Sequence, residues 1–344
     1  MNKRILIDDV QQFAEHFDLW EQLRNKAFLI TGATGLIGSV LAKCLLELNR
    51  QKSLGIKMIA VVRSLEKAHK VFADEYPEIL FHQIDLYKIN QNSIKEHIDY
   101  VVHLASPTAS KYFVEHPVET LRTAVEGTTA VLDFAKDAKV KGVVYASSLE
   151  TYGSNHTDDW LKEDFQGYVN PTEVRSSYNI GKRASECLCH SYALEYDVPV
   201  TIARFTQVFG AGISLEENRV FAQFARSVIK GEDIVLHTKG DSAKPYCYTI
   251  DAVSAILYLL LRGVKGEAYN IANKDSFISI REMAQMVVNE FNTDIRVIVS
   301  QNDNMGYAPE TRLKLNTSKI EALGWHPRYE LREMFERLIN FMKI

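Results

Sequence analysis

The chain has 344 residues, of which 46% are hydrophobic and 24% charged, and its formal net charge is −4 at pH 7. This composition is typical of a globular protein, and the length suffices for one large domain or two smaller ones. Basic residues are dispersed and no run approaches the roughly 18 apolar residues of a membrane span, so we expect a cytoplasmic protein that binds neither nucleic acid nor a membrane.

Residues 1–25 predict a helical extension ahead of the first strand. Phe13, Phe17, Trp20 and Leu23 fall at helical spacing, so we expect an amphipathic helix that lays its apolar face on the adjoining domain.

A glycine-rich turn, Thr31-Gly-Ala-Thr-Gly-Leu-Ile-Gly38, follows the strand-like run 27–30 and leads into a helical pattern over 36–48. Gly32 can take a positive φ, Gly35 lets a ligand approach the backbone, and Gly38 lets helix and strand pack closely. The N-terminus of the helix presents unpaired N–H groups to an anion, which is most simply the pyrophosphate of a dinucleotide.

The segment 57–62 reads as a second strand, and its end is where a dinucleotide fold selects its cofactor. An acidic residue there would bind the ribose hydroxyls of NAD, whereas Arg63 could pair with the 2′-phosphate of NADP. Arg63 could also stack on adenine or face water, so both cofactors stay open.

Strands and helices alternate through the first half of the chain, as in an α/β fold with a Rossmann-like, doubly wound parallel sheet. The carboxyl ends of parallel strands face the ligand crevice, which places Asp85, Ser106, Ser147 and Ser148 near a bound cofactor or substrate. The further strands are predicted at 79–84, 100–105, 142–147 and 198–203, and the helices at 118–138 and 177–196.

The alternation of strands and helices becomes less regular after about residue 205. Helices are predicted near 218–230, 250–262 and 279–291 and from about Leu331, with a strand at 233–236. We therefore expect a dinucleotide-binding domain over 26–205 and a smaller substrate-binding lobe over 206–344, with some return to the first domain near 245–272.

Tyr178 and Lys182 are four residues apart, so both side chains lie on one helical face. Cys187 and Cys189 in the same helix point about 200° apart. With Cys44 and Cys247 they show neither a metal-ligand spacing nor a disulfide framework, so we predict no metal site.

This set of features resembles the extended, nucleotide-sugar-modifying branch of the short-chain dehydrogenase/reductase superfamily, the NAD-dependent epimerases and dehydratases, from about residue 26 to the end of the chain. The motifs that carry the resemblance are the turn Thr31–Gly38, His103-Leu-Ala105, Ser148 ahead of Tyr152-Gly153, and Tyr178-x-x-x-Lys182.

The resemblance implies a tightly held NAD or NADP that is recycled within each turnover, and a nucleotide-diphosphate sugar as substrate. The implied cofactor contacts are Thr31, Gly32, Thr34, Gly35, Leu36, Ile37, Gly38, Arg63, Asp85, Leu86, Leu104, Ala105, Ser106, Tyr178 and Lys182. The implied substrate contacts are Ser106, Gln207, Arg219, Lys244 and Arg312, and the implied catalytic residues are Ser148, Glu150, Tyr178 and Lys182.

Ordinary side-chain chemistry supports these roles. Tyrosine has a pKa of about 10, but an adjacent ammonium from Lys182 and an oxidised nicotinamide both favour the phenolate. Tyr178 would take a hydroxyl proton while hydride leaves the same carbon, Ser148 would hydrogen-bond the oxygen that becomes a carbonyl, and Lys182 would also hold the nicotinamide ribose.

Within the branch, the chain is especially similar to the UDP-glucuronate decarboxylases, through His103-Leu-Ala-Ser-Pro107, the stretch 146–153, Val174-Arg-Ser-Ser-Tyr178 and Asn218-Arg-Val220. Glu150 stands where decarboxylases and 4,6-dehydratases carry a glutamate, and Arg312 stands where the decarboxylases carry a substrate-binding arginine. The chain departs from the decarboxylase pattern at Leu149 (usually serine), Gln207 and Ala124 (usually asparagine) and Lys244 (usually a phosphate-binding arginine).

These residues support three hypotheses. The first is a lyase that oxidises C4 of a nucleotide sugar, loses CO2 or water, and returns the hydride. The second is a 4-epimerase, which has no use for Glu150. The third is a non-catalytic dinucleotide sensor or scaffold, against which the retention of Ser148, Tyr178 and Lys182 argues. The resemblance also implies a homodimer in which the helices near 118–138 and 178–196 pair across a two-fold axis.

Overall fold

The computed structural model describes residues 2–155, 157–300 and 310–343, and its centre is a seven-stranded sheet in the order β11-β7-β5-β4-β1-β2-β3. All neighbouring strands in this sheet are parallel, as in a Rossmann-like fold. The strands are β1 Ala27–Thr31, β2 Lys57–Val62, β3 Leu80–Gln83, β4 Tyr100–His103, β5 Gly142–Ser148, β7 Val200–Phe205 and β11 Ala268–Ile271.

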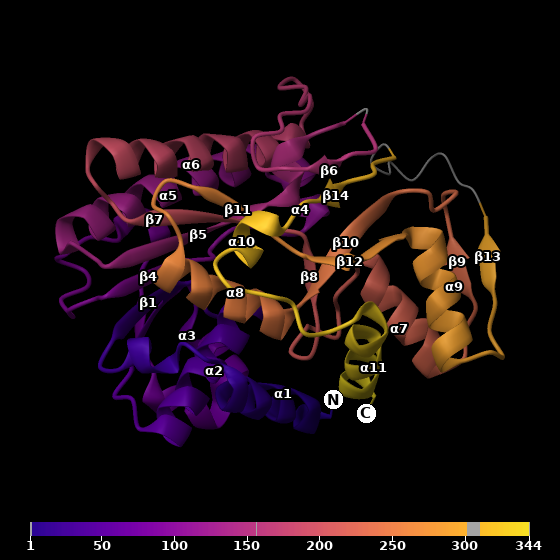
Figure 1. Ribbon diagram of the computed structural model, residues 1–344, viewed down its shortest axis with the longest axis horizontal. Helices are drawn as coiled ribbons and strands as arrows, with labels where there is room; N and C mark the ends of the chain where they lie inside the picture. The colour runs from indigo at the N-terminus through magenta and orange to yellow at the C-terminus, as the bar shows by residue number, and fades with distance from the viewer. Residues whose placement is uncertain (1, 156, 301–309, 344) are drawn as a thin grey trace.

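Helices cover both faces of the main sheet (Figure 1), which is why its central strands are rich in apolar residues on both sides. Alternate residues of β1 belong to different cores: Phe28 and Ile30 pack with one set of helices, and Ala27 and Leu29 with the other. The first set is α2 Leu36–Lys52, α3 Leu65–Phe72 and α8 Thr249–Arg262; the second is α5 Pro117–Ala138 and α6 Ser176–Glu195.

The predicted α/β class with a parallel Rossmann-like sheet is confirmed. The strand predicted at 198–203 instead runs from Val200 to Phe205, because Pro199 has no N–H to donate to the ladder. Cys187 is exposed and Cys189 buried, as their spacing predicts. Within the described ranges, no helix is both long and apolar enough to cross a membrane.

A smaller lobe lies at one end of the main sheet (Figure 1). Its three-stranded sheet has the order β12-β10-β8, and two strand pairs, β13-β9 and β14-β6, lie outside it. The strands are β6 Trp160–Leu161, β8 Gln207–Phe209, β9 Ile234–Leu236, β10 Ala243–Tyr248, β12 Asn273–Ser279, β13 Val297–Val299 and β14 Lys314–Leu315. The helices of the lobe are α7 Val220–Lys230, α9 Ile280–Phe291 and α11 Leu331–Met342. Two short helices, α4 Ser110–Glu115 and α10 Ser318–Glu321, pack against α5 and β11 of the main domain. The 3-10 segments of the chain are η1 Trp20–Leu23, η2 Ala73–Glu78, η3 Leu86–Lys88 and η4 Leu149–Tyr152. In the sequence, α8 and β11 lie between strands β10 and β12 of this lobe, but both elements pack in the main domain.

The N-terminal segment forms two elements where one helix was predicted. Helix α1, Lys3–His16, ends because Phe17 is extended, with φ −71° and ψ 112°, and Trp20 lies in the separate turn η1. Between them, the Asp18 carboxylate accepts a 2.7 Å hydrogen bond from the Tyr258 hydroxyl on α8. The single-helix prediction is therefore wrong, because the backbone is extended at Phe17 and Asp18 contacts α8 instead of continuing the helix. Phe13, Phe17 and Leu23 are nevertheless buried as expected.

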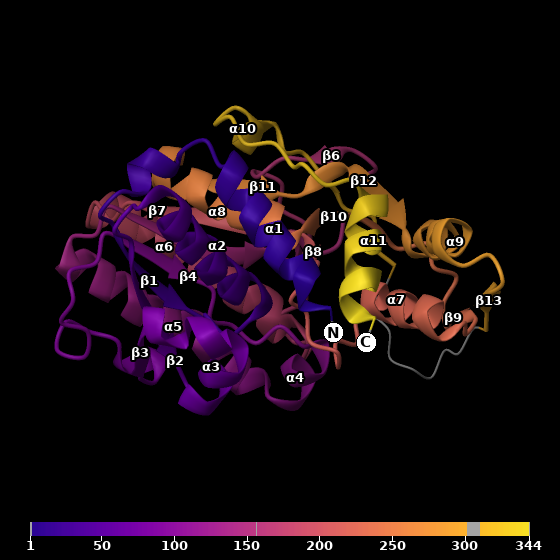
Figure 2. The same ribbon diagram turned by 90° about the horizontal axis from the view of Figure 1, so that it is seen from below.

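Helix α1 joins the two parts of the molecule, since it packs on α2 and α8 of the main domain and on α11 of the lobe (Figure 2). Asp9 on α1 is buried and accepts hydrogen bonds from the Tyr248 hydroxyl at 2.5 Å and from Arg337 Nη1 at 2.6 Å. Burial raises the pKa of Asp9 to about 6.

Candidate active site

The glycine turn after β1 has the geometry of a phosphate cradle. Gly32 has φ +72°, and a Cβ there would lie 2.7 Å from the backbone nitrogen of Ala105, so only glycine suits this position. A Cβ at Gly38 would overlap the carbonyl oxygen of Gly32, whereas one at Gly35 would meet only that oxygen, at 3.3 Å. The open side at Gly35, and the lack of a side-chain cap on α2, leave the first N–H groups of the helix without a side-chain partner, as an anion site at a helix N-terminus requires.

Thr31 ties this turn to the neighbouring strand. Its buried hydroxyl lies 2.7 Å from His103 Nδ1 and accepts a hydrogen bond from the Ala105 N–H at 3.3 Å. The other ring nitrogen of His103 lies 3.2 Å from the Thr128 hydroxyl on α5. Burial, together with the charge of Lys182, lowers the pKa of His103 to about 3, so this imidazole is neutral and serves as a structural link.

The remaining predicted cofactor residues lie along the same carboxyl edge of the sheet. Arg63 follows β2; it is exposed, and its backbone oxygen accepts a 3.1 Å hydrogen bond from Gln83 Nε2. Asp85 follows β3 and caps η3 by accepting the Tyr87 N–H at 3.2 Å. The partly buried members of this edge are Thr34, Leu36, Ile37, Leu86, Leu104, Ala105 and Ser106.

Ser148, Tyr178 and Lys182 are brought together where β5 ends and α6 begins. The Ser148 hydroxyl accepts the Glu150 N–H at 3.2 Å and lies close enough to the Tyr178 phenol to lower its pKa. The buried Tyr178 ring stacks on Phe113 with centroids 4.2 Å apart. Lys182 is 4% exposed and donates from Nζ to the Ala146 carbonyl at 2.7 Å. This arrangement fits a proton acceptor with a hydrogen-bonding hydroxyl beside it.

The electrostatics of Tyr178 differ from the sequence-based expectation. Burial raises its pKa well above the ordinary value, and the Glu150 carboxylate adds to the increase. The groups that lower it are Ser148, Arg175 and Arg219, while Lys182, whose Nζ lies 5.8 Å from the Tyr178 ring centroid, has its own pKa lowered to about 8 by burial. The phenol is therefore protonated in this structure.

Beside this trio lies a group of charged side chains that we call the ionic half of the site: Glu150, Arg175, Arg219 and Lys244. Glu150 on η4 forms a two-point ion pair with Arg175, with Nη1–Oε2 at 2.9 Å and Nη2–Oε1 at 3.3 Å. The Glu150 carbonyl accepts a 2.8 Å hydrogen bond from Asn179 Nδ2 on α6. Glu150 is thus fixed to the first turns of the helix that carries Tyr178.

Arg175 is the residue of this group that sequence reasoning missed as a functional one. It is the residue that precedes α6 and lies three residues before Tyr178, in the stretch that carried the resemblance. The sequence contained a signal for Arg175. Residues three apart lie on one face of a helix, so Arg175 would share a face with Tyr178 if the helical conformation extended back to it.

Lys244 and Arg219 come from the lobe. Burial lowers the pKa of Lys244, as do the nearby Arg175 and Arg219, whereas Glu150 raises it. Arg219 pairs with Glu217 at 2.6 Å. Three cations and two carboxylates therefore converge here, which gives a net positive space suited to an anionic ligand.

The other predicted substrate residues are less closely gathered. Gln207 begins β8 in register with Tyr246 on β10, and Ser106 donates to the Pro107 carbonyl at 3.1 Å. Arg312 pairs in the backbone with Ala243, next to Lys244, but its Nε lies 3.8 Å from an Asp158 carboxylate oxygen and the side chain is 46% exposed. Arg312 thus lies at the rim and not among the ionic half.

Leu149, which stands in place of a serine, faces away from the site. Its side chain is buried in an apolar cluster with Tyr152, Leu161, Ala272, Leu313 and Leu315. The cluster attaches η4 to β14. It therefore connects the turn that carries Glu150 with the segment that carries Arg312. The substitution removes a hydroxyl and contributes packing instead.

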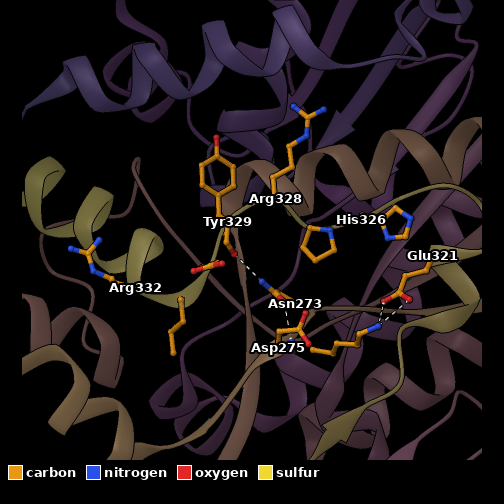
Figure 3. Close-up of a pocket in the computed structure, with 11 residues that line it drawn as sticks. Asn273, Asp275, Glu321, His326, Arg328, Tyr329 and Arg332 are labelled. Atoms are coloured by element: carbon orange, nitrogen blue, oxygen red, sulfur yellow. Dashed lines mark hydrogen bonds and ion pairs between the residues drawn. The ribbon is translucent and has the colours of Figure 1, made fainter. Parts of the chain in front are cut away.

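Two cavities lie elsewhere. One, of about 600 Å³, is bounded by β12, the segment 326–330 and the start of α11 (Figure 3), and the other is of about 410 Å³. None of the predicted site residues lines either one, and polar groups of the first already pair with each other, as in Lys274–Glu321 at 3.1 Å and Asn273 Nδ2–Tyr329 O at 2.8 Å. Across residues 2–155, 157–300 and 310–343, no cluster of three or more His, Cys, Asp or Glu side chains could hold a metal ion.

Comparison with known proteins gives a consistent picture. The NAD dependent epimerase/dehydratase family matches residues 28–272. The chain is 31% identical to UDP-N-acetyl-alpha-D-glucosaminuronate decarboxylase of Bacillus cytotoxicus, over 93% of this chain and 98% of that one. It is 28% identical to UDP-glucuronic acid decarboxylase 5 of Arabidopsis thaliana, over 90% and 87% of the two chains. The crystal structure of UDP-glucuronic acid 4-epimerase from Bacillus cereus, in complex with UDP-glucuronic acid and NAD, superposes with a TM-score of 0.77 at 19% identity, covering 92% of this chain and 98% of that one.

Proposed function

The chain belongs to the NAD dependent epimerase/dehydratase family, and on this basis we propose that it is a lyase that decarboxylates the uronate form of a UDP-sugar through transient oxidation at C4. The observation that carries the proposal is the Glu150–Arg175 ion pair, held beside Ser148, Tyr178 and Lys182. Two relatives named as decarboxylases of UDP-linked uronates support it.

The oxidation step uses the buried trio. A nicotinamide cofactor held along the carboxyl edge of the sheet would supply the hydride acceptor. With the positive charges of Lys182 and of a bound oxidised nicotinamide nearby, Tyr178 would lose its proton, and the phenolate would then take the proton of the C4 hydroxyl. Ser148 would hydrogen-bond the oxygen that becomes the ketone. Lys182 would also hold the ribose hydroxyls.

The second step uses the ionic half. A C4 ketone makes the C6 carboxylate a β-keto acid, so the bond between C5 and C6 breaks with loss of CO2, and the electron pair passes into an enolate at C5. C5 then takes a proton, which Glu150 would relay from water, and Arg175 would both orient Glu150 and offer a cation to the C6 carboxylate before it leaves as CO2. The turnover is completed when the hydride returns to C4 and Tyr178 gives its proton back to the C4 oxygen. Lys244 and Arg219 would face the diphosphate.

The direct test is to incubate the protein with UDP-glucuronate and UDP-N-acetylglucosaminuronate and to measure CO2 and the sugar product by mass spectrometry. Release of CO2 with formation of a pentose-type sugar supports the proposal. A 4-keto-6-deoxy product from dTDP- or UDP-glucose would assign a 4,6-dehydratase instead, and inversion at C4 alone would assign an epimerase. Binding of dinucleotide without turnover of any UDP-, dTDP-, GDP- or CDP-sugar would assign the sensor or scaffold.

The cofactor proposed is NAD or NADP, kept on the protein and recycled. The glycine turn suits either one, because the two cofactors differ only at the 2′ position. Arg63, exposed at the end of β2, is the residue that we expect to meet this position.

We further propose a homodimer formed through α5 and α6. These helices pack side by side on one face of the sheet (Figure 1), and on them Val118, Leu121 and Leu194 are large apolar residues that remain exposed, by 62%, 38% and 73%. Light scattering at micromolar concentration should give twice the chain mass; a monomeric mass would reject the proposal.

A further inference from the structure

One turn beyond Lys182, helix α6 carries a buried carboxylate that the proposed mechanism does not use. Glu186 is 8% exposed and lies between the helix and the sheet. Arg204 on β7 donates to it from Nε at 3.0 Å and from Nη2 at 2.7 Å, and the Ser147 hydroxyl on β5 donates to the same carboxylate.

These contacts fasten α6 at one level of the sheet. Ser147 and Arg204 are directly paired across β5 and β7, so Glu186 binds both strands at a single rung of the ladder. The rung next to it contains Ala146, whose carbonyl accepts the Lys182 ammonium, and Ser148 follows on the other side. The position of α6 along the strands, and hence the distance between Tyr178 and Ser148, depends on this anchor.

Glu186 also differs in charge from everything else that faces Lys182. From α6 the neighbours are Tyr178, Glu186 and Cys189; from β5 they are Tyr145 and the Ala146 carbonyl; from β4 it is His103. Within the described chain, Glu186 is the carboxylate among them, and it acts to raise the pKa of Lys182 against the lowering by burial.

Arg204 keeps this carboxylate in place. It is 6% exposed, its Nη1 donates to the Glu163 carbonyl at 2.7 Å, and its guanidinium lies 4.9 Å from the Tyr152 ring centroid. A buried ion pair with this many hydrogen bonds is rigid, and removal of one partner leaves the other charge uncompensated.

We propose that Glu186 is a positioning residue for the oxidation step: through Ser147 and Arg204 it sets the register of α6 on the sheet, and it places a carboxylate one helical turn beyond Lys182. The proposal rests on the proposed function only in that this step is the oxidation of a sugar hydroxyl.

The test is the Glu186→Gln variant, compared with Glu186→Asp, which keeps the charge, and with Glu195→Gln, a matched change at the exposed far end of the same helix. We measure the titration of Lys182 by NMR of lysine-labelled protein, with a Lys182→Met sample to assign the signal. The apparent pKa of Lys182 should fall from about 8 by roughly one unit in Glu186→Gln, the size expected when a nearby opposite charge is lost. Glu186→Asp should restore most of it and Glu195→Gln should leave it unchanged.

The second readout is the pH profile of cofactor reduction in a single turnover. Its alkaline limb should move to lower pH in Glu186→Gln by the same amount as the lysine titration, whereas a purely structural role would lower the rate equally at every pH. If Glu186→Gln fails to fold, the double variant Glu186→Gln/Arg204→Met removes both buried charges. It should shift the lysine titration in the same direction but by less, because the loss of the Arg204 cation offsets part of the loss of the Glu186 anion.

An unshifted lysine titration in a folded variant overturns the proposal. Failure of the proposed function is a separate outcome: no nucleotide sugar would reduce the cofactor, while the lysine titration, which needs no substrate, would still report the effect of Glu186.

Discussion

Ser148, Tyr178 and Lys182 are held by the main sheet and by α6, whereas Glu150, Arg175, Arg219 and Lys244 come from η4, from the residue before α6 and from two segments of the lobe. The first group is anchored by backbone carbonyls and by a buried ion pair behind it. The second is held by ion pairs between partly exposed side chains. On the proposed function, the oxidation step would rest on side chains fixed in the core, and the fate of the oxidised sugar would rest on side chains that can exchange partners with a substrate.

Replacing the proton acceptor should give the largest effect. Tyr178→Phe removes the hydroxyl but keeps the ring that stacks on Phe113, so folding and dinucleotide binding should change little. Loss of a proton-transfer group costs about 10²- to 10⁴-fold, and stopped-flow absorbance of the reduced nicotinamide should show that this loss falls on cofactor reduction. Near-normal turnover in this variant would reject the mechanism.

Glu150→Gln should separate the two halves of the site. Cofactor reduction should persist. The rising limb of its pH profile should move to lower pH, because the variant lacks the negative charge that raises the pKa of Tyr178. Product formation should slow by roughly 100-fold, so reduced cofactor should accumulate. If CO2 or water is released at the normal rate, or if the protein is a fully active epimerase, Glu150 has no role in the second step.

Arg175→Met should cause a smaller loss of product formation than Glu150→Gln, and it should shift the pH profile of cofactor reduction in the opposite direction. The change frees Glu150 from its two-point ion pair and removes a cation that lowers the pKa of Tyr178, so the rising limb of cofactor reduction should move to higher pH. We expect about a tenfold loss of product formation, the size of one charge-assisted hydrogen bond. A double variant with Glu150→Gln should lose less than the sum of the two single changes, because both remove the same pair; strict additivity would contradict the pairing.

Arg63→Asp should have the smallest effect on the chemical step, since Arg63 lies exposed at the end of β2 and away from the trio. Titration calorimetry of the cofactor-free protein should show a much larger loss of affinity for NADP than for NAD, because the new carboxylate repels a 2′-phosphate but can accept ribose hydroxyls. Equal losses would show that Arg63 does not read the 2′ position.

The parts of this molecule that sequence reasoning predicted are those that depend on local spacing. The glycines of the turn and the pair Tyr178 and Lys182 follow from the period of one helix and one βα connection. The pair Glu150–Arg175 joins residues 25 apart in sequence, and Lys244 reaches them from another lobe; no single periodicity connects these positions.

Two further features have the same origin. The helix predicted across Phe17 ends at His16, and Asp18 accepts a hydrogen bond from Tyr258, 240 residues away. The Leu149 side chain packs with Leu313 and Leu315. In each case a long-range contact decides a conformation that local preference leaves open.

The buried contact between Asp9 and Arg337 joins residues 328 apart, and this has a consequence for the order in which the protein assembles. During synthesis α2 follows α1 closely and can cover part of its apolar face, but α11 and the partners of the Asp9 carboxylate, Tyr248 and Arg337, exist only when most of the chain has been made. The main sheet can form in the meantime from strands made earlier, except that β11 also arrives late. We therefore expect the docking of α1 to be among the last events of folding, and the interval before it to be when the nascent chain most needs protection from aggregation.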